Sequence, residues 1–214
     1  MRLRIGLTQR VEHLPDREER RDCLDQAWTP LLLALGFWPI PLPNCTDDPR
    51  ALVDELQLHG IILTGGNDVN EAPGATRTAP ERDRFERTLL SVCAETGLPV
   101  LGVCRGLQLL VIHYGGKLVP IPGHAATSHP IRSRPGTSAL TDREAVNSFH
   151  AFGIREETLS PEIEALATAP DGSVEAVRHR RFRQWGIMWH PERPPHDAQN
   201  ATLLRALFTR VARL

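Results

Sequence analysis

Residues 99–106 read PVLGVCRG, and this stretch decides how the chain folds. The apolar run 100–103 suits a short strand buried on both faces, and a helix-compatible apolar segment follows it. Gly102 and Gly106 bracket Cys104, which is the G-x-nucleophile-x-G elbow with cysteine in place of serine. Glycines here remove Cβ atoms that would collide in a sharp strand-to-helix turn. The Cys104 thiol would then lie at a helix N-terminus, where the dipole and free N–H groups favour a thiolate.

Taken alone, this turn also fits a buried structural thiol, since free cysteine is among the most buried residue types. A nucleophilic cysteine needs a base, a group that orients the base, and donors for the developing oxyanion. The rest of the chain therefore decides between the two interpretations.

Composition excludes several classes of protein. The 214 residues include 41% hydrophobic and 24% charged residues, which fits one globular α/β domain over residues 1–214. A net charge of -1 gives no reason to expect nucleic acid or an anionic membrane as partner. The four cysteines lack CxxC or zinc-type spacing, which argues against a disulfide framework.

Without a signal-peptide pattern or a transmembrane-length apolar run, we expect a cytoplasmic protein that acts on a small molecule without a cofactor. The sequence is compatible both with a monomer and with a homo-oligomer.

The first half of the chain alternates predicted strands and helices, which is typical of βαβ units in a parallel sheet. Strands are expected at residues 3–8, 39–43, 61–64 and 100–103, and helices at 16–35, 49–58, 81–96 and 107–112. Prolines in 39–43 favour an edge position for that strand.

The second half changes character. Short strand-like runs are expected at residues 117–121, 145–149, 163–168, 174–177 and 184–189, before a terminal helix at 197–212. The sequence therefore predicts a three-layer, flavodoxin-like α/β fold with a mostly parallel central sheet and antiparallel hairpins added in the second half.

His190 is the candidate base. It follows a predicted strand, and Pro191 stiffens the placement of Glu192, whose carboxylate can accept the imidazole N–H and set its tautomer. The same HPE segment also fits a strand-end histidine beside a surface glutamate.

Candidate oxyanion donors follow two strands. Gly65 and Gly66 end one predicted strand, and the backbone N–H of Arg105 follows Cys104 at the end of another. Ligands of open parallel sheets bind beyond the carboxyl ends of the strands, where these groups would converge.

Several motifs occur in the order and roughly the spacing of class I glutamine amidotransferase-like proteins. They are LTGGND (63–68), RDxFE (82–86), GVCRGLQLL (102–110), GGKL (115–118), HPI (129–131), VNSFH (146–150) and GIMWHPE (186–192). The set covers nearly the whole chain and most resembles the free-standing γ-glutamyl hydrolases.

This resemblance implies a catalytic triad of Cys104, His190 and Glu192, with the Gly66 and Arg105 N–H groups as the oxyanion hole. The implied activity is hydrolysis of a γ-glutamyl amide through a glutamyl-thioester on the cysteine.

The resemblance also implies which residues hold the glutamyl group. They are Gly65, Gln108, Asn147, Ser148 and His150. The chain departs from the family at Met188, where glutamine is usual, and at residues 151–152, where many relatives carry histidine and glutamine. These departures suggest a reshaped pocket for the leaving group.

Gln9 and Arg10 follow the first predicted strand, on the same rim as Cys104, and the predicted helix 16–35 begins with several arginines. Guanidinium groups suit bidentate phosphate contacts. The segment with TQR at 8–10 and ERRDCLDQAW at 19–28 resembles hydrolases of capsule and nucleotide-activated sugar pathways, including γ-glutamyl-CDP-amidate hydrolases. The expected substrate is γ-glutamyl-CDP-amidate in capsule phosphoramidate biosynthesis, although the same arginines also fit the solvated face of an amphipathic helix.

Other functions remain open at this stage. The chain also fits a glutaminase subunit that supplies ammonia to a separate synthetase, a γ-glutamyl-aminobutyrate hydrolase, or a catalytically silent binding protein.

Two further groups of residues attract functional interpretations. His124 and His129 suggest a metal pair, but no cysteine or clustered carboxylate accompanies them in sequence, so we expect no metal. The arginines within 178–183 are expected to form a solvated hairpin turn.

Overall fold

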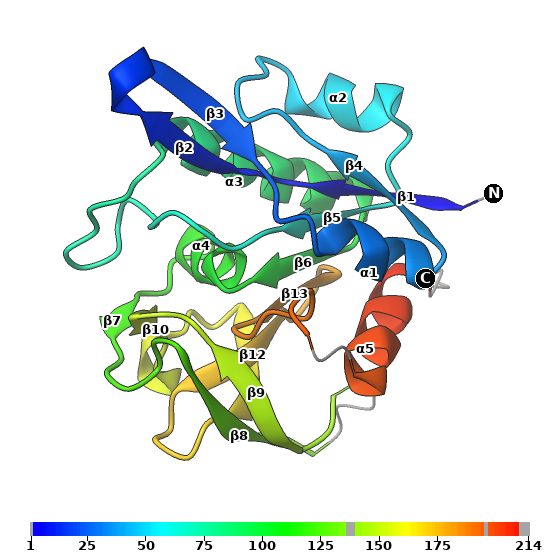
Figure 1. Ribbon diagram of the computed structural model, residues 1–214. Coiled ribbons are helices and arrows are strands. Elements are labelled where there is room, and N and C mark those ends of the chain that lie inside the picture. The colour runs from blue at the N-terminus through cyan, green and yellow to red at the C-terminus, as the bar shows by residue number, and fades with distance from the viewer. Residues whose placement is uncertain (1, 136–139, 195–196, 210–214) are drawn as a thin grey trace.

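Parallel strands form one half of a continuous sheet in the computed structural model, which describes residues 2–135, 140–194 and 197–209. In sheet order they are β4 (Phe37–Pro41), β1 (Leu3–Leu7), β5 (Gly60–Leu63), β6 (Val100–Val103) and β13 (Gln184–Ile187). The antiparallel strands β12 (Val174–His179), β11 (Ile163–Thr168), β8 (Thr127–Ser133) and β9 (Arg143–Ser148) continue the same sheet. The predicted fold class is therefore confirmed, with β4 at the edge (Figure 1).

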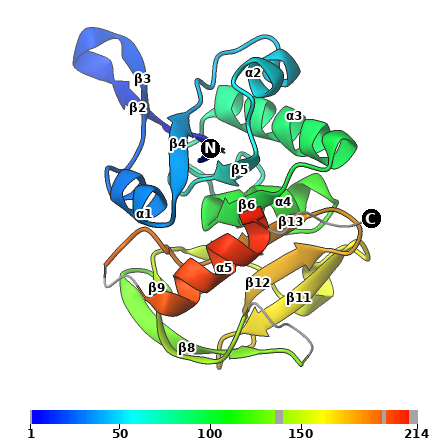
Figure 2. The ribbon, with the colours of Figure 1, turned by 90° about the vertical axis from the view of Figure 1, so that its right-hand side faces the viewer.

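Helices cover both faces of this sheet (Figures 1 and 2). The helices α2 (Pro49–Glu55), α3 (Pro80–Thr96) and α4 (Arg105–His113) contribute to one buried apolar cluster. The helices α1 (Trp28–Ala34) and α5 (Ala198–Thr209) contribute to a second cluster on the opposite face. Residues 210–212 of the predicted terminal helix lie outside the described residues.

The helix boundaries follow from local chemistry. Pro80 occupies the first turn of α3, where a missing N–H costs nothing, and Gly97 ends that helix at a left-handed φ of 74°. Asp48 caps α2 by accepting a 2.9 Å hydrogen bond from the Ala51 N–H. The predicted strand 100–103 is buried at every position because helices cover both faces.

The predicted helix over residues 16–35 is wrong in its first half. The strands β2 (Arg10–Leu14) and β3 (Glu19–Cys23) instead form an antiparallel hairpin around the 3-10 turn η1 (Pro15–Arg17). Glu18 closes the turn at a left-handed φ of 52°. Apolar residues recur at helical spacing only in the second half of the segment, where α1 forms, and the charged residues 16–22 have no buried face to present. Figure 2 shows the hairpin extending away from the sheet.

The remaining elements lie in the second half. The strands β7 (Val119–Pro120) and β10 (Phe152–Gly153) pair with each other, and η2 (Glu156–Thr158) is a short 3-10 turn. The strand β8 differs from the prediction, because Pro130 interrupts a segment in which only Ile131 is fully buried. None of the helices within the described residues combines the length and apolar character that crossing a bilayer requires.

Candidate active site

Cys104 occupies the turn between β6 and α4 with φ 52° and ψ -106°, a conformation that L-residues rarely adopt. Both flanking glycines are needed for this turn. A Cβ on Gly102 would lie 2.5 Å from the Gly106 carbonyl carbon, and a Cβ on Gly106 would overlap the Leu63 carbonyl oxygen. Such a strained turn persists only where its surroundings impose it, which is typical of a functional position. The structure thus contains the sharp strand-to-helix turn that the sequence predicts around Cys104.

The neighbouring strand β13 brings His190 to the elbow. Val103 and Ile187 are register partners in β6 and β13, and the Cys104 N–H donates a 2.8 Å hydrogen bond to the Ile187 carbonyl. A Cβ on Gly65 would lie 2.7 Å from His190 Cε1 and 3.6 Å from Cys104 Cβ. The glycine turn, the thiol and the imidazole therefore meet at the carboxyl ends of three adjacent parallel strands.

The His190 imidazole is buried and oriented by Glu192. Its Nδ1 lies 2.7 Å from Glu192 Oε1, so Nδ1 carries a proton toward the carboxylate and Nε2 is the nitrogen left for Cys104. Burial lowers the pKa of His190, but hydrogen bonds with Cys104 and Glu192 outweigh burial and raise the pKa to about 9. The His190 imidazole is therefore protonated at neutral pH.

Asn147 fixes the main chain of His190. Its Oδ1 accepts a 2.8 Å hydrogen bond from the His190 N–H, and its Nδ2 donates a 2.9 Å bond to the His190 carbonyl. The side chain of a β9 residue thereby ties the antiparallel half of the sheet to the candidate base.

A buried arginine holds the glycine turn after β5. Arg82, on α3, donates to the carbonyls of Thr64 at 2.6 Å, Gly65 at 3.1 Å and Gly66 at 2.9 Å. With these carbonyls turned toward α3, the peptide units of the turn are held in one orientation. The Gly66 N–H is one of the two predicted oxyanion donors, so this orientation bears directly on the site.

The second predicted donor is anchored by the same helix. The Arg105 side chain pairs with Asp83 and Glu86, and Arg82 Nε donates a 2.8 Å hydrogen bond to the other oxygen of Glu86. The Arg105 N–H is the first of α4 and has no partner within the helix, which leaves it for a ligand. Burial and the neighbouring Arg105 lower the pKa of Arg82 to about 10, which still leaves it charged at neutral pH.

This ion network was missed as a functional element. The RDxFE motif carries part of the resemblance in sequence, and the i, i+4 spacing of Arg82 and Glu86 on a predicted helix is also a signal for the ion pair.

Sequence comparison agrees with this geometry. The profile of the family described as Peptidase C26 matches residues 5–192. The chain belongs to the Peptidase C26 family. A γ-glutamyl-CDP-amidate hydrolase from Campylobacter jejuni is 31% identical, over 96% of this chain and 97% of its own length. A γ-glutamyl-γ-aminobutyrate hydrolase from Escherichia coli O157:H7 is 30% identical, over 86% of this chain and 83% of its own length.

A solved structure shares the fold. The crystal structure of a putative GMP synthase subunit from Thermoplasma acidophilum has a TM-score of 0.71 and 17% sequence identity. The match covers 98% of this Peptidase C26 chain and 94% of that chain. This structure confirms the fold, while the family match and the two hydrolase relatives confirm the predicted resemblance to class I glutamine amidotransferase-like γ-glutamyl hydrolases.

The residues predicted to hold a glutamyl group make internal contacts. Gln108 Nε2 donates to the Phe152 carbonyl at 2.7 Å, and Ser148 Oγ donates to the His124 carbonyl at 2.7 Å. His150 is buried, and burial lowers its pKa to about 4, so its imidazole is neutral at neutral pH. The contact of these residues, of Asn147 and of Gly65 with a glutamyl group stays a prediction.

Gln9 and Arg10 are placed differently from each other. Gln9 Nε2 donates to the Leu42 carbonyl at 2.9 Å, whereas the Arg10 side chain lies over Gly66, whose Cβ would come within 2.9 Å of Arg10 Cδ. Arg10 and Gly66 also border a cavity of about 460 Å³ beneath the β2–β3 hairpin. The other residues lining this cavity include His13, Arg20 and Arg77. It is adjacent to the small pocket that contains His190 and Glu192, because Arg10 and Gly66 line both.

The four thiols are free. Cys93 is buried, and burial raises its pKa to about 12, whereas Cys23 lines the pocket beside His190. The predicted hairpin turn lies at residues 180–183, between β12 and β13. Arg178 is at the end of β12, where it pairs with Glu164 at 2.8 Å, and Arg183 donates to the Leu207 carbonyl.

Proposed function

We propose that this protein is a cysteine-dependent hydrolase that cleaves a γ-glutamyl amide and releases L-glutamate. The observation that carries the proposal is the meeting of Cys104, in its strained elbow, with a His190 that Glu192 orients. The two relatives named as hydrolases of γ-glutamyl compounds support the same substrate class.

The first half of the reaction forms a thioester. The Cys104 thiolate attacks the γ-carbonyl carbon, and the N–H groups of Gly66 and Arg105 stabilise the resulting oxyanion. His190 then gives its Nε2 proton to the amide nitrogen, the C–N bond breaks, and the amine leaves.

The second half regenerates the enzyme. His190 Nε2 takes a proton from water as the water oxygen attacks the thioester carbon, and the C–S bond breaks to release glutamate. Throughout, Glu192 keeps Nδ1–H in place, so that Nε2 faces the reacting atoms.

Steady-state hydrolysis tests this proposal. Cys104→Ala and His190→Ala are each expected to lower kcat for a γ-glutamyl amide by about 10⁴-fold or more. Cys23→Ala, which removes the neighbouring thiol, is expected to keep wild-type activity. Equal loss in Cys23→Ala and Cys104→Ala would contradict the assignment, and an enzyme active only with an added synthetase chain would indicate an ammonia-supplying subunit.

We further propose that the leaving group is an anionic nucleotide, with γ-glutamyl-CDP-amidate as the substrate and a role in capsule phosphoramidate biosynthesis. The cavity beneath the hairpin supports this, because arginine side chains border it directly beside Gly66. Its volume of about 460 Å³ falls within the range of small-molecule sites. Within the described part of the chain Arg77 forms no ion pair, whereas Arg10 pairs with Glu12 and Arg20 with Glu81. Arg77 is therefore the arginine with most to gain from a phosphate.

Substrate competition tests this finer proposal. The wild type is expected to prefer γ-glutamyl-CDP-amidate over γ-glutamyl-aminobutyrate and glutamine by kcat/KM. Arg10→Ala and Arg77→Ala should each lose about 10–100-fold on the nucleotide substrate alone, the equivalent of one charge-assisted hydrogen bond. Arg50→Ala, an exposed arginine paired with Glu95 away from the cavity, is the matched control. A wild-type preference for the aminobutyrate amide would overturn the nucleotide assignment and leave the hydrolase assignment intact.

A further inference from the structure

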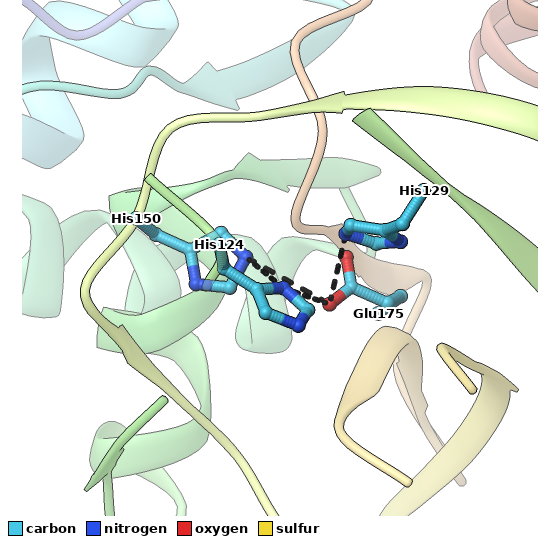
Figure 3. Close-up of side chains that lie close together, drawn as sticks. All are labelled: His124, His129, His150 and Glu175. Atoms are coloured by element: carbon cyan, nitrogen blue, oxygen red, sulfur yellow. Dashed lines mark hydrogen bonds and ion pairs between the residues drawn. The ribbon is translucent and has the colours of Figure 1, made fainter. Parts of the chain in front are cut away.

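Three histidines and a glutamate converge in the antiparallel half of the fold, and none of them belongs to the proposed triad of Cys104, His190 and Glu192, although His150 is also predicted to contact the glutamyl group. His124 comes from the loop before β8, His129 from β8, His150 from the segment after β9, and Glu175 from β12. One ligand atom from each lies within 4.8 Å of all the others (Figure 3). Long-range folding alone brings Glu175 to the histidines, which is why the sequence offered no carboxylate beside His124 and His129.

The distances match a small coordination sphere. His124 Nδ1 lies 3.3 Å from His150 Nε2 and 3.5 Å from Glu175 Oε1. Glu175 Oε1 lies 3.7 Å from His150 Nε2 and 3.9 Å from His129 Nε2. In a tetrahedral zinc site, bonds of about 2.0–2.1 Å separate neighbouring ligand atoms by about 3.3–3.4 Å. The cluster needs only a small inward movement, mainly of His129, to reach that geometry.

The outer hydrogen bonds set the tautomer of each histidine. His150 Nδ1 lies 3.0 Å from the Phe152 carbonyl and His129 Nδ1 lies 3.1 Å from the Pro130 carbonyl, so both nitrogens carry the proton. His124 Nε2 lies 3.4 Å from Asp171 Oδ2, which draws its proton outward in the same way. Each imidazole thus turns its unprotonated nitrogen inward, and such outer partners are typical of metal-binding histidines.

The centre of the cluster therefore requires a positive charge. Three nitrogen lone pairs and the buried Glu175 carboxylate face one another with all four ligand atoms within 4.8 Å, and this arrangement is repulsive unless a cation joins them. A proton on His124 Nδ1 would be shared with His150 Nε2 and Glu175 Oε1 only. His129 Nε2 is buried and has no hydrogen-bond partner among the described residues, so a proton leaves it unsatisfied. A metal ion satisfies all four ligand atoms together.

We infer that His124, His129, His150 and Glu175 bind one divalent transition-metal ion of the zinc class. Imidazole and carboxylate ligands suit zinc, and four protein ligands leave no open position, which is the pattern of a structural site. The ion would tie the loop before β8 and the end of β9 to β12. It would thereby stiffen the segment whose Asn147 holds the His190 main chain.

Metal binding by the full-length protein tests this inference without reference to hydrolysis. Chelator-stripped protein is expected to bind one zinc ion per chain, with Tm rising by about 5–10 °C when free zinc is about 100 times Kd. Cobalt(II) added instead of zinc should give the intense visible absorption of a tetrahedral site.

Variants separate this cluster from other sites. Glu175→Gln and His129→Gln are expected to abolish the zinc-dependent Tm rise, and Asp171→Asn to weaken zinc binding by about 10–100-fold through the outer contact to His124. His113→Gln removes a half-buried imidazole outside the cluster and should bind zinc like the wild type. If Glu175→Gln does not fold, His129→Gln, at the more exposed edge of the cluster, decides the test. No zinc binding by the wild type, or undiminished binding by His129→Gln, would overturn the inference.

Discussion

His190 shows how one residue couples the candidate chemistry to pH. Burial lowers its pKa, yet hydrogen bonds with Cys104 and Glu192 raise it from 6.5 to about 9. The folded chain therefore holds this proton more tightly than the unfolded chain does. The stabilising contribution of His190 is complete below about pH 6.5 and is lost as the pH rises through about 9.

This difference predicts a pH-dependent effect of one substitution. His190→Gln should destabilise the protein more below pH 6.5 than above pH 9, because the proton-linked contribution exists only at the lower pH. Urea denaturation of the wild type and of His190→Gln at both pH values measures the gap between their free energies of unfolding, with His113→Gln as the histidine control. A gap that stays constant across this range would contradict the raised pKa.

Substitution of Gly106 tests whether the close packing of the turn around Cys104 is required. A Cβ at this position would overlap the Leu63 carbonyl oxygen, which is backbone and cannot turn aside. We expect Gly106→Ala to destabilise the fold by about 1–3 kcal/mol or more and to displace Cys104. Gly74→Ala is the comparison, since its Cβ meets open space and only the φ of 75° costs energy. Denaturation curves for the two variants would contradict the account if Gly74→Ala proved the more damaging.

Among the elements, α3 acts as the support of the site. Arg82 fixes the turn after β5 through three carbonyls, and Asp83 and Glu86 hold the side chain of Arg105. One helix thus holds the segments that carry both predicted oxyanion donors.

Arg82→Lys tests this support. Lysine keeps the charge but lacks the planar fork that reaches several carbonyls, so the turn should relax. We expect kcat to fall by about 10–100-fold with KM little changed, because oxyanion contacts strengthen in the transition state. Arg87→Lys, at a half-buried arginine of α3 paired with Glu71, is the matched control and should keep wild-type kinetics. A rise in KM at constant kcat would instead indicate a substrate-binding role.

At the scale of single elements, apolar spacing predicted those strands and helices that form by burying an apolar face. The strands β5 and β6 and the helix α3 lie close to their predicted ranges because each buries a strong apolar pattern. The hairpin of β2 and β3 was misread because its mostly exposed residues carry no such pattern, and it is held by Asn67, which bonds both main-chain groups of Val11 at 2.8 and 2.9 Å. Because Asn67 and Val11 are far apart in the sequence, their contact gives no signal within the hairpin segment itself.

At the scale of the whole molecule, the site lies where the parallel and antiparallel halves of the sheet meet. Cys104 follows β6, His190 follows β13, and the Asn147 side chain reaches His190 from β9. The elbow, the base and the glycine turn were predictable because strand ends converge in any parallel sheet. The roles of Asn147 and of the histidine–glutamate cluster were not, because the order of the antiparallel strands is set by long-range packing.

The central claim is that Cys104 forms the covalent intermediate, and intact-protein mass spectrometry with a γ-glutamyl electrophile tests it most directly. We expect a single adduct that peptide mapping assigns to Cys104, and no adduct in Cys104→Ala. Cys23, which lines the same pocket, is the internal comparison. An adduct on Cys23, Cys45 or Cys93 with Cys104 unmodified would contradict the account.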